Sequence, residues 1–328
     1  MDLAVASASS AVLAFIASFL LVRALKNRFL ELGITGTDVH KPDKPKIPER
    51  VGIGPLLAFI SSICVLAALL PQSSILFSAL MATSSLGGLI GLLDDVLNLG
   101  GKIKPLISSI AALPLVISGC LSPRPFLPLI GHARMYFVYW PLILVFFAVI
   151  MNATNMADAL NGMMPSSVIV VALSMVPGLI LTRKYQLIPV LVAFIAALLP
   201  YYWYNKYPAK VFGGNVGSMF VGASLAGIAT ASNLEMFLVI SMLPFFITGF
   251  MIIYSVGGFR ERREMERRPT LLEGDLIRAN PDEKAPMTII AILTSDRPKR
   301  EYEIVREFLV LTLISGILSI ISLLLTFL

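Results

Sequence analysis

Long apolar stretches separated by short polar segments recur along the whole chain. A helix that crosses a membrane needs about 20 mostly apolar residues. Stretches of roughly this length lie at residues 3–22, 51–70, 74–93, 103–121, 134–151, 163–182, 187–204, 215–233, 235–257 and 307–328. The pattern predicts an all-α, polytopic membrane protein with about ten transmembrane helices in a single membrane domain, residues 1–328.

The composition supports this interpretation. Of the 328 residues, 57% are hydrophobic and only 14% are charged, whereas a soluble globular protein carries about 25% charged residues. The net charge of +6 would also suit a nucleic-acid-binding protein. Basic loops retained in the cytosol explain this charge better in a membrane protein, so no nucleic-acid partner is expected.

The basic residues are distributed unevenly between alternate loops. The segments 23–50, 94–104, 205–214 and 259–306 hold 22 of the 26 Lys and Arg residues, and the remaining loops hold four. Basic loops stay in the cytosol, so these four segments are predicted to be cytosolic and both termini extracytosolic. Residues 23–50 would form a cytosolic linker, and 259–306 a loop subdomain between the last two helices.

Two adjacent carboxylates end the third apolar stretch. Asp94 and Asp95 fall at the cytosolic end of a helix that runs inward, and a helix C-terminus favours cations rather than anions. A metal ion or a lysine should therefore compensate them, and Lys102 and Lys104 follow on the same loop. An ordinary solvated helix end is the alternative.

Polar side chains also end the fifth stretch. Asn152 and Asn155 lie one turn apart and can face the same neighbour, and Asp158 and Asn161 follow them. Carboxamide and carboxylate oxygens suit a hard cation such as Mg²⁺. The alternative is simple helix termination, where Asn is common.

Glycines open the eighth stretch. In the sequence VFGGNVGS (211–218), two glycines and a capping Asn215 would leave backbone N–H groups free at a helix N-terminus that faces the cytosol. Such a terminus can hold a phosphate, although a plain capped turn is the alternative. Five arginines between residues 260 and 268 either bind phosphate or anchor the loop at lipid headgroups. Together these features indicate a Mg²⁺-assisted reaction on a phosphate-bearing substrate at the membrane surface.

Four motifs along the chain resemble those of one enzyme family. The sequences IPE (47–49), DDVLNLGGKIK (94–104), NATNMADALNG (152–162) and VFGGNVGSMFVG (211–222) are similar to those of the polyprenyl-phosphate N-acetylhexosamine-1-phosphate transferase superfamily. They look closest to its UDP-GlcNAc–dolichyl-phosphate GlcNAc-1-phosphate transferase branch. Asn215 stands where the family usually has a metal-binding Asp, which suggests a divergent, archaeal type of enzyme.

The resemblance implies a transfer of GlcNAc-1-phosphate from UDP-GlcNAc to a polyprenyl or dolichyl phosphate, with release of UMP. Mg²⁺, or Mn²⁺ as a substitute, would be required. The expected partners are these two substrates, membrane lipid and a second copy in a homodimer, at a cell or endoplasmic reticulum membrane with a cytosolic active site. The implied catalytic residues are Asp94, Asp95 and Lys104; those that bind substrate are Glu49, Asn98, Asn152, Asn161 and Arg267; those that bind metal are Asn155, Asn215 and Asp158.

Two other functions stay open. One is the same reaction with another UDP-HexNAc donor in assembly of a cell-envelope glycan. The other, from a different class, is transport of a lipid or a solute, which intramembrane charges and broken helices can indicate. The apolar stretches are nearly free of charge and the acids gather at one surface, so the enzyme is favoured.

Overall fold

The computed structural model of the protein describes residues 3–258 and 267–327, which are mainly helical. The helices are α1 (Leu3–Glu31), α2 (Ile53–Leu69), α3 (Ser74–Leu97), α4 (Ile103–Ser109), α5 (Leu113–Ile117), α6 (Tyr139–Met156), α7 (Met163–Leu181), α8 (Ile188–Asn205), α9 (Gly214–Ser232), α10 (Glu235–Ser241), α11 (Leu243–Ser255), α12 (Ile289–Leu293) and α13 (Glu301–Phe327). Antiparallel hairpins join β1 (Thr35–Thr37) to β2 (Lys46–Pro48), β3 (Phe126–Leu127) to β4 (Gly131–His132), and β5 (Thr270–Glu273) to β6 (Leu276–Ala279).

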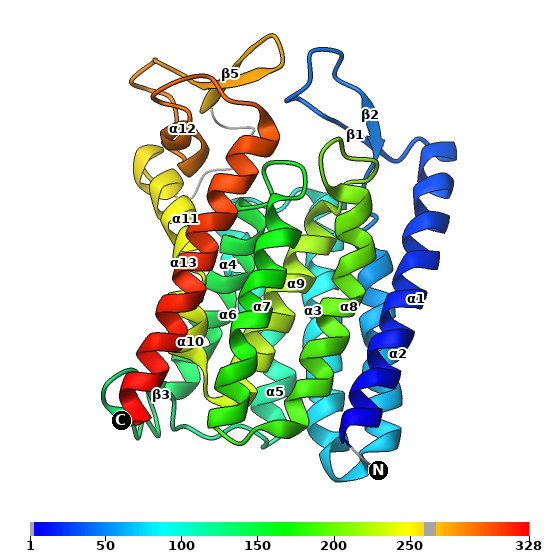
Figure 1. The fold of residues 1–328 in the computed structure, drawn as a ribbon, viewed down its shortest axis with the longest axis vertical. Helices are drawn as coiled ribbons and strands as arrows, with labels where there is room; N and C mark the ends of the chain where they lie inside the picture. The colour runs from blue at the N-terminus through cyan, green and yellow to red at the C-terminus, as the bar shows by residue number, and fades with distance from the viewer. Residues whose placement is uncertain (1–2, 259–266, 328) are drawn as a thin grey trace.

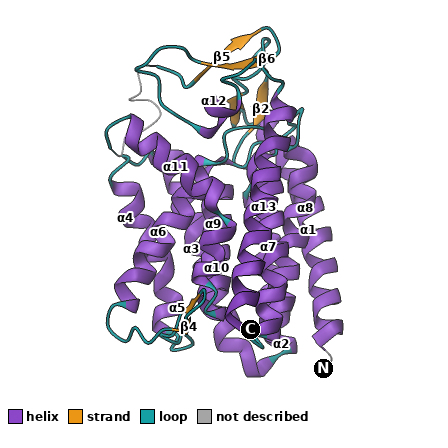
Figure 2. Cartoon of the chain, turned by 60° about the vertical axis from the view of Figure 1, so that its left-hand side comes forward, coloured by secondary structure: helices purple, strands orange, loops and turns teal. Residues whose placement is uncertain are grey.

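The long helices run side by side along one direction (Figure 1). Both chain ends lie at one end of this bundle, which we call the terminal end. The hairpins β1–β2 and β5–β6 lie with α12 at the opposite end, called here the hairpin end (Figure 2). The hairpin end therefore carries the linker 23–50 and the described part of the loop 259–306, whose residues 259–266 lie outside the described chain.

The expected fold class, an all-α polytopic membrane protein, is confirmed. Six helices in the described ranges are long and apolar enough to cross a membrane, or seven spans if the bent pair α10–α11 counts as one. The other three expected stretches coincide with α2, which has 17 residues, with the interrupted segment α4–α5, and with α9.

Residues 235–257, expected as one helix, form two helices that meet at a bend of 73°. The second helix begins beside Pro244, which lies in its first turn. Proline suits a first turn because its missing N–H would have no partner there, and for the same reason it cannot continue a helix from the preceding turn. After the bend, α11 continues toward the hairpin end as a separate helix (Figure 1).

Helix α9 is the central element of the bundle. Every residue from Val216 to Ser232 is buried, and α3 and α6 pack along it. Glycines allow the closest contact: a Cβ on Gly91 of α3 would lie 2.2 Å from the carbonyl oxygen of Asn215. Small residues let helix backbones approach closely in membranes. The contact brings the C-terminus of α3 against the N-terminus of α9, where the candidate site lies.

Candidate active site

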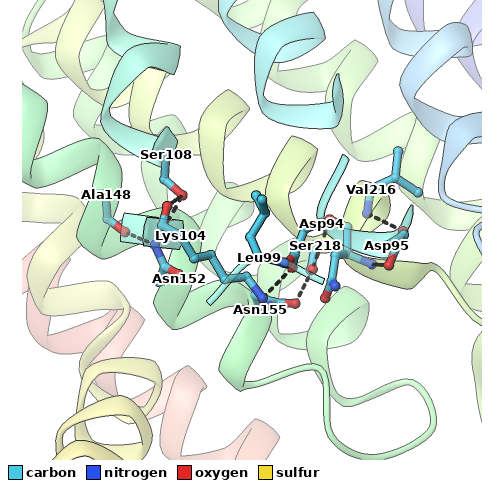
Figure 3. Close-up of polar contacts among 11 residues, drawn as sticks. Asp94, Asp95, Leu99, Lys104, Ser108, Ala148, Asn152, Asn155, Val216 and Ser218 are labelled. Atoms are coloured by element: carbon cyan, nitrogen blue, oxygen red, sulfur yellow. Dashed lines mark hydrogen bonds and ion pairs between the residues drawn. The ribbon is translucent and has the colours of Figure 1, made fainter. Parts of the chain in front are cut away.

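The two carboxylates at the end of α3 have different partners. Asp94 is 3% exposed and pairs with Lys104, with 2.5 Å between its Oδ2 and the lysine Nζ. Its Oδ1 accepts a hydrogen bond from the backbone N–H of Leu99 at 3.0 Å (Figure 3). The expectation that a lysine or a metal ion compensates the negative charge at this helix end is confirmed for Asp94. The lysine is Lys104, in the first turn of α4.

Asp95 faces the N-terminus of α9. Its two carboxylate oxygens accept the backbone N–H groups of Asn215 at 2.9 Å and of Val216 at 3.1 Å. The first helical N–H groups lack partners within their own helix, and a negative charge is stabilised there. Asp95, at the end of α3, therefore caps the N-terminus of α9. The guanidinium of Arg50 donates a hydrogen bond to the backbone carbonyl oxygen of Asp95 at 2.7 Å.

This cap corrects one expectation from the sequence. The N–H groups predicted to stay free for a phosphate are occupied by Asp95, and Asn215 does not act as the capping residue, since Gly213 holds that position without a side-chain cap. Gly214 makes the close approach possible, because it has φ +69° and a Cβ there would lie 2.7 Å from Asp95 Oδ2. The sequence pattern was consistent with either outcome because a capping carboxylate 120 residues away leaves no local signal.

The two asparagines near the end of α6 lie beside the acidic pair (Figure 3). The carbonyl oxygen of the Asn155 side chain accepts a hydrogen bond from Ser218 Oγ at 2.8 Å. The Asn152 amide donates to the Ala148 carbonyl oxygen at 2.7 Å and to Ser108 Oγ at 3.2 Å. These bonds orient both amides, and the Asn155 oxygen keeps a second lone pair for a ligand.

Asp158 follows in the loop after α6 and makes no side-chain hydrogen bond or ion pair with the described chain. Burial raises the pKa of its carboxyl group to about 7, and the negative charge of Asp95 adds to the rise. Two carboxylates that repel each other away from bulk water are stabilised by a cation between them. The region beside Asp158 and Asp95 therefore favours a cation.

A cavity of about 1420 Å³ brings these side chains together. Its polar part lies at the hairpin end, and its apolar part lies between α4, α6 and α11. The polar part is lined by Glu49, Asp95, Lys104, Asn152, Asn155, Asp158, Asn161 and Asn215, and the apolar part by Leu106, Leu144, Val145, Val149, Phe246 and Phe250, among others. One cavity thus offers both charged and hydrocarbon-like surroundings.

Of the predicted site residues, eight line this cavity and three do not. Asp94 lies behind Lys104, and Asn98, which ends α3 at φ +53°, is exposed. Arg267 pairs with Asp282 at 3.2 Å and is also absent from the lining. Arg260, Arg262 and Arg263 lie outside the described residues.

Sequence reasoning missed a second group of charges beside Asn161. Asp38, Lys41 and Glu301 are joined by ion pairs, and both acids contact the Asn161 amide. The linker 23–50 was expected only as a cytosolic connection, and the start of α13 carries no motif that points to a site. No short motif links these residues, because they come from three distant parts of the chain.

The donors in the cavity suit a hard divalent cation, although they are not a set of acids alone. Within residues 3–258 and 267–327, no three His, Cys, Asp or Glu side chains are grouped to hold a metal ion. The oxygen donors are instead mixed, with Asp95 and Asp158 supplying charge and Asn155 and Asn215 supplying amide oxygens. Oxygen donors of these kinds fit Mg²⁺ better than softer metals.

Comparison with known proteins relates this chain to one family of enzymes. The model of glycosyl transferase family 4 matches residues 77–233. A Saccharolobus solfataricus protein, provisionally named UDP-N-acetylglucosamine–dolichyl-phosphate N-acetylglucosaminephosphotransferase, is 31% identical over 228 residues, 69% of each chain. A Bacillus subtilis protein, provisionally named undecaprenyl-phosphate N-acetylglucosaminyl 1-phosphate transferase, is 28% identical over 258 residues, 74% of this chain and 71% of its own. A Streptococcus suis phospho-N-acetylmuramoyl-pentapeptide-transferase is 29% identical over 192 residues, 56% of this chain and 58% of its own.

Proposed function

The chain belongs to glycosyl transferase family 4, and from this premise we propose that it transfers N-acetylglucosamine 1-phosphate from UDP-GlcNAc to a polyprenyl or dolichyl phosphate. An oxygen of the lipid phosphate attacks the β-phosphorus of UDP-GlcNAc. The bond from this phosphorus to the oxygen that bridges the α-phosphate breaks, and UMP leaves. The product is a lipid-linked sugar pyrophosphate, the first membrane intermediate of a glycan of the N-linked type.

The observation that carries this proposal is the continuity of the cavity. A polyprenyl phosphate has an anionic head on a long hydrocarbon chain, and a nucleotide sugar is polar throughout. The apolar walls of α4, α6 and α11 suit the hydrocarbon chain, and the polar part around Lys104, Asn155 and Asp158 suits two phosphorylated groups. Reaction requires that these groups meet in one place, which a single cavity provides.

The side chains have distinct parts in this reaction. Lys104 lines the cavity and supplies positive charge to the phosphates. Asp94, which does not line the cavity, holds the ammonium group of Lys104 in place through their ion pair. Phosphoryl transfer depends mainly on positioning and charge neutralisation. The attacking lipid phosphate is already an anion, so Asp95 acts by holding the α3–α9 junction and by its charge, without a need to remove a proton.

We propose Mg²⁺ as the cofactor, with Mn²⁺ as a substitute. When bound, the ion neutralises negative charge on the pyrophosphate of the donor. The oxygens that would hold it are those of Asn155, Asn215, Asp158 and Asp95. Asn215 brings no charge, so Asp158 supplies charge that the amide lacks.

The same proposal includes the membrane topology. Ten spans, of which α2 is short, α4–α5 is interrupted and α10–α11 is bent, would place both termini outside and the hairpin end on the cytosolic side of the cell or endoplasmic reticulum membrane. The 22 basic residues of the cytosolic segments support this orientation, as does the position of both chain ends at the terminal end (Figure 1). Labelling of single cysteines introduced into the loops tests it. We also propose that the protein forms a homodimer. The molecular mass of the protein in detergent, corrected for bound detergent, tests this.

The deciding experiment is an assay of purified protein with UDP-GlcNAc, dolichyl or undecaprenyl phosphate, and Mg²⁺. We expect release of UMP together with a lipid-linked GlcNAc pyrophosphate. UDP-GalNAc and UDP-glucose, offered in competition, identify the donor. Lipid product without preference for GlcNAc would indicate another envelope glycan, and no UMP from any donor would contradict the enzyme and favour a transporter.

A further inference from the structure

Three charged side chains from distant segments meet at the wall of the cavity, and one of them, Asp38, lines it. Asp38 and Lys41 belong to the loop between β1 and β2, and Glu301 begins α13. Lys41 Nζ lies 3.4 Å from Asp38 Oδ2 and forms an ion pair with Glu301. Both acids are 3% exposed. We call these three residues the charge cluster.

Lys41 stays cationic within this cluster. Burial alone would lower the pKa of Lys41, but its hydrogen bond and ion pair with Glu301, and then the charge of Asp38, raise it above the usual value. The ammonium group also lies 4.3 Å from the centre of the Tyr207 ring, a cation–π contact. The lysine therefore holds the two buried carboxyl groups together. Burial raises the pKa of Glu301, and the hydrogen bond from Lys41 opposes this rise.

The two carboxylates together bind one asparagine. Glu301 Oε1 accepts the backbone N–H of Asn161 at 2.6 Å, and Asp38 Oδ2 accepts its side-chain amide at 2.9 Å. Glu301 Oε2 lies 3.5 Å from the same amide nitrogen. An ionised carboxylate can only accept hydrogen bonds, so these contacts fix which end of the Asn161 amide faces the cluster.

The other end of the amide is left for a ligand. Asn161 is 6% exposed and lines the cavity. Its side-chain oxygen makes no hydrogen bond with residues 3–258 or 267–327. This oxygen is not among the buried side-chain atoms that lack a partner, so it is accessible from the cavity. An amide oxygen held in a fixed orientation there can accept a hydrogen bond from a molecule in the cavity.

We propose that Asp38 and Glu301, joined by Lys41, are positioning residues that hold the Asn161 amide with its oxygen toward the donor substrate. The oxygen accepts an N–H or O–H group of UDP-GlcNAc, so this inference rests on the proposed function. The cluster also ties the β1–β2 loop, the α6–α7 loop and α13 together at the hairpin end. Binding of the donor, rather than the chemical step, is the property that it sets.

The test is Glu301→Gln, with Glu303→Gln as its control. A glutamine at 301 offers a donor as well as an acceptor, so the Asn161 amide can adopt the opposite orientation. Glu303 lies two residues further along α13, and among the described residues its side chain accepts a hydrogen bond from the N–H of Arg300 alone, which a glutamine also accepts. We expect Glu301→Gln to raise KM for UDP-GlcNAc about tenfold, the effect of one hydrogen bond, with kcat within about threefold and KM for the polyprenyl phosphate unchanged.

Calorimetric binding of UDP and of UDP-GlcNAc to both variants identifies the group that Asn161 accepts. Equal weakening of both ligands places the donor group on the nucleotide, and weakening of UDP-GlcNAc alone places it on the sugar; either supports the proposal. Unchanged affinity, the same loss in Glu303→Gln, or a lower kcat with unchanged KM overturns it. If Glu301→Gln does not fold, Asp38→Asn carries the same test.

These outcomes are separate from those of the proposed function. If wild-type protein binds UDP but releases no UMP, the transferase proposal fails and the binding measurements still judge the charge cluster. Wild-type protein that binds neither ligand overturns both proposals.

Discussion

Replacement of Lys104 by methionine should separate the structural from the catalytic part of its ion pair with Asp94. Both side chains are nearly buried, with 11% and 3% of their surface exposed, and their charged atoms are 2.5 Å apart. Solvent therefore screens this pair little. Removal of one member of such a pair leaves an unpaired buried charge, which costs about 3–5 kcal/mol of the free energy of unfolding.

A second change should recover much of that loss. In Asp94→Asn/Lys104→Met the buried charge is gone, and the asparagine oxygen still accepts the Leu99 N–H that Asp94 Oδ1 accepts now. The remaining cost is an amide N–H group without a partner, about 1–3 kcal/mol. Denaturation in mixed detergent micelles measures both variants, and Lys102→Met, on the exposed neighbouring lysine, is the control.

Turnover should not recover with stability. Lys104 lines the cavity, and loss of its charge should lower kcat on the order of 100-fold, as loss of a group that stabilises transition-state charge does. We expect this loss in the single and the double variant, measured as UMP release. A double variant with a wild-type rate would show that Lys104 acts on the fold alone. A destabilisation below about 1 kcal/mol in Lys104→Met would refute the assignment of a tightly coupled buried pair.

The remaining predictions concern the other acids and the metal. Asp95→Asn keeps one of two N–H acceptors and loses the charge, so UMP release should cease while the free energy of unfolding falls by only about 1–3 kcal/mol; a wild-type rate would remove Asp95 from the site. Asn215→Asp should lower the Mg²⁺ concentration for half-maximal rate, and an unchanged value would show that Asn215 does not contact the metal. The pKa of Asp158 is raised from 3.8 to about 7, so the folded protein binds this proton more tightly than the unfolded chain, and stability without Mg²⁺ should fall as pH rises through this interval. Melting curves should lose that slope in Asp158→Asn, and an unchanged slope would contradict the assignment.

The fold was predictable to the extent that its signals are local. Apolar stretches of membrane length marked the helices, because each needs only its own residues to satisfy its backbone in lipid. The bend between α10 and α11 was missed, although Pro244 was visible, because a proline also occurs within straight spans. In residues 103–121, Pro105 lies in the first turn of α4 and does not interrupt it. The helix passes through a 3₁₀ turn at Ile110–Ala112, then continues as α5, which has Pro114 in its first turn and ends at Ile117.

The site was predictable in its residues and less so in their partners. Asp94 and Lys104 are ten residues apart, and their pairing could be expected from one loop. The bonds from Asp95 to the N-terminus of α9, and from Asp38 to Asn161, join residues more than 100 positions apart. Packing of α3 on α9 creates the first of these contacts, and no periodicity or motif encodes it. Arg267, expected to bind substrate, forms an exposed ion pair with Asp282, and its role stays a prediction.

The enclosure of α9 bears on how the protein is made. Its buried residues are largely Gly, Ala, Ser and Thr, so the helix has little hydrocarbon surface with which to partition into lipid by itself. Both α3 and α6, which flank it, precede it in the chain and are synthesised first. We therefore expect membrane insertion of α9 to require that these earlier helices have already formed the place where it packs. A Cβ on Gly87 would lie 2.4 Å from the Cβ of Ala223, and a Cβ on Gly91 is equally crowded. A large side chain at either glycine should therefore impair membrane insertion of α9 and lower the amount of folded protein.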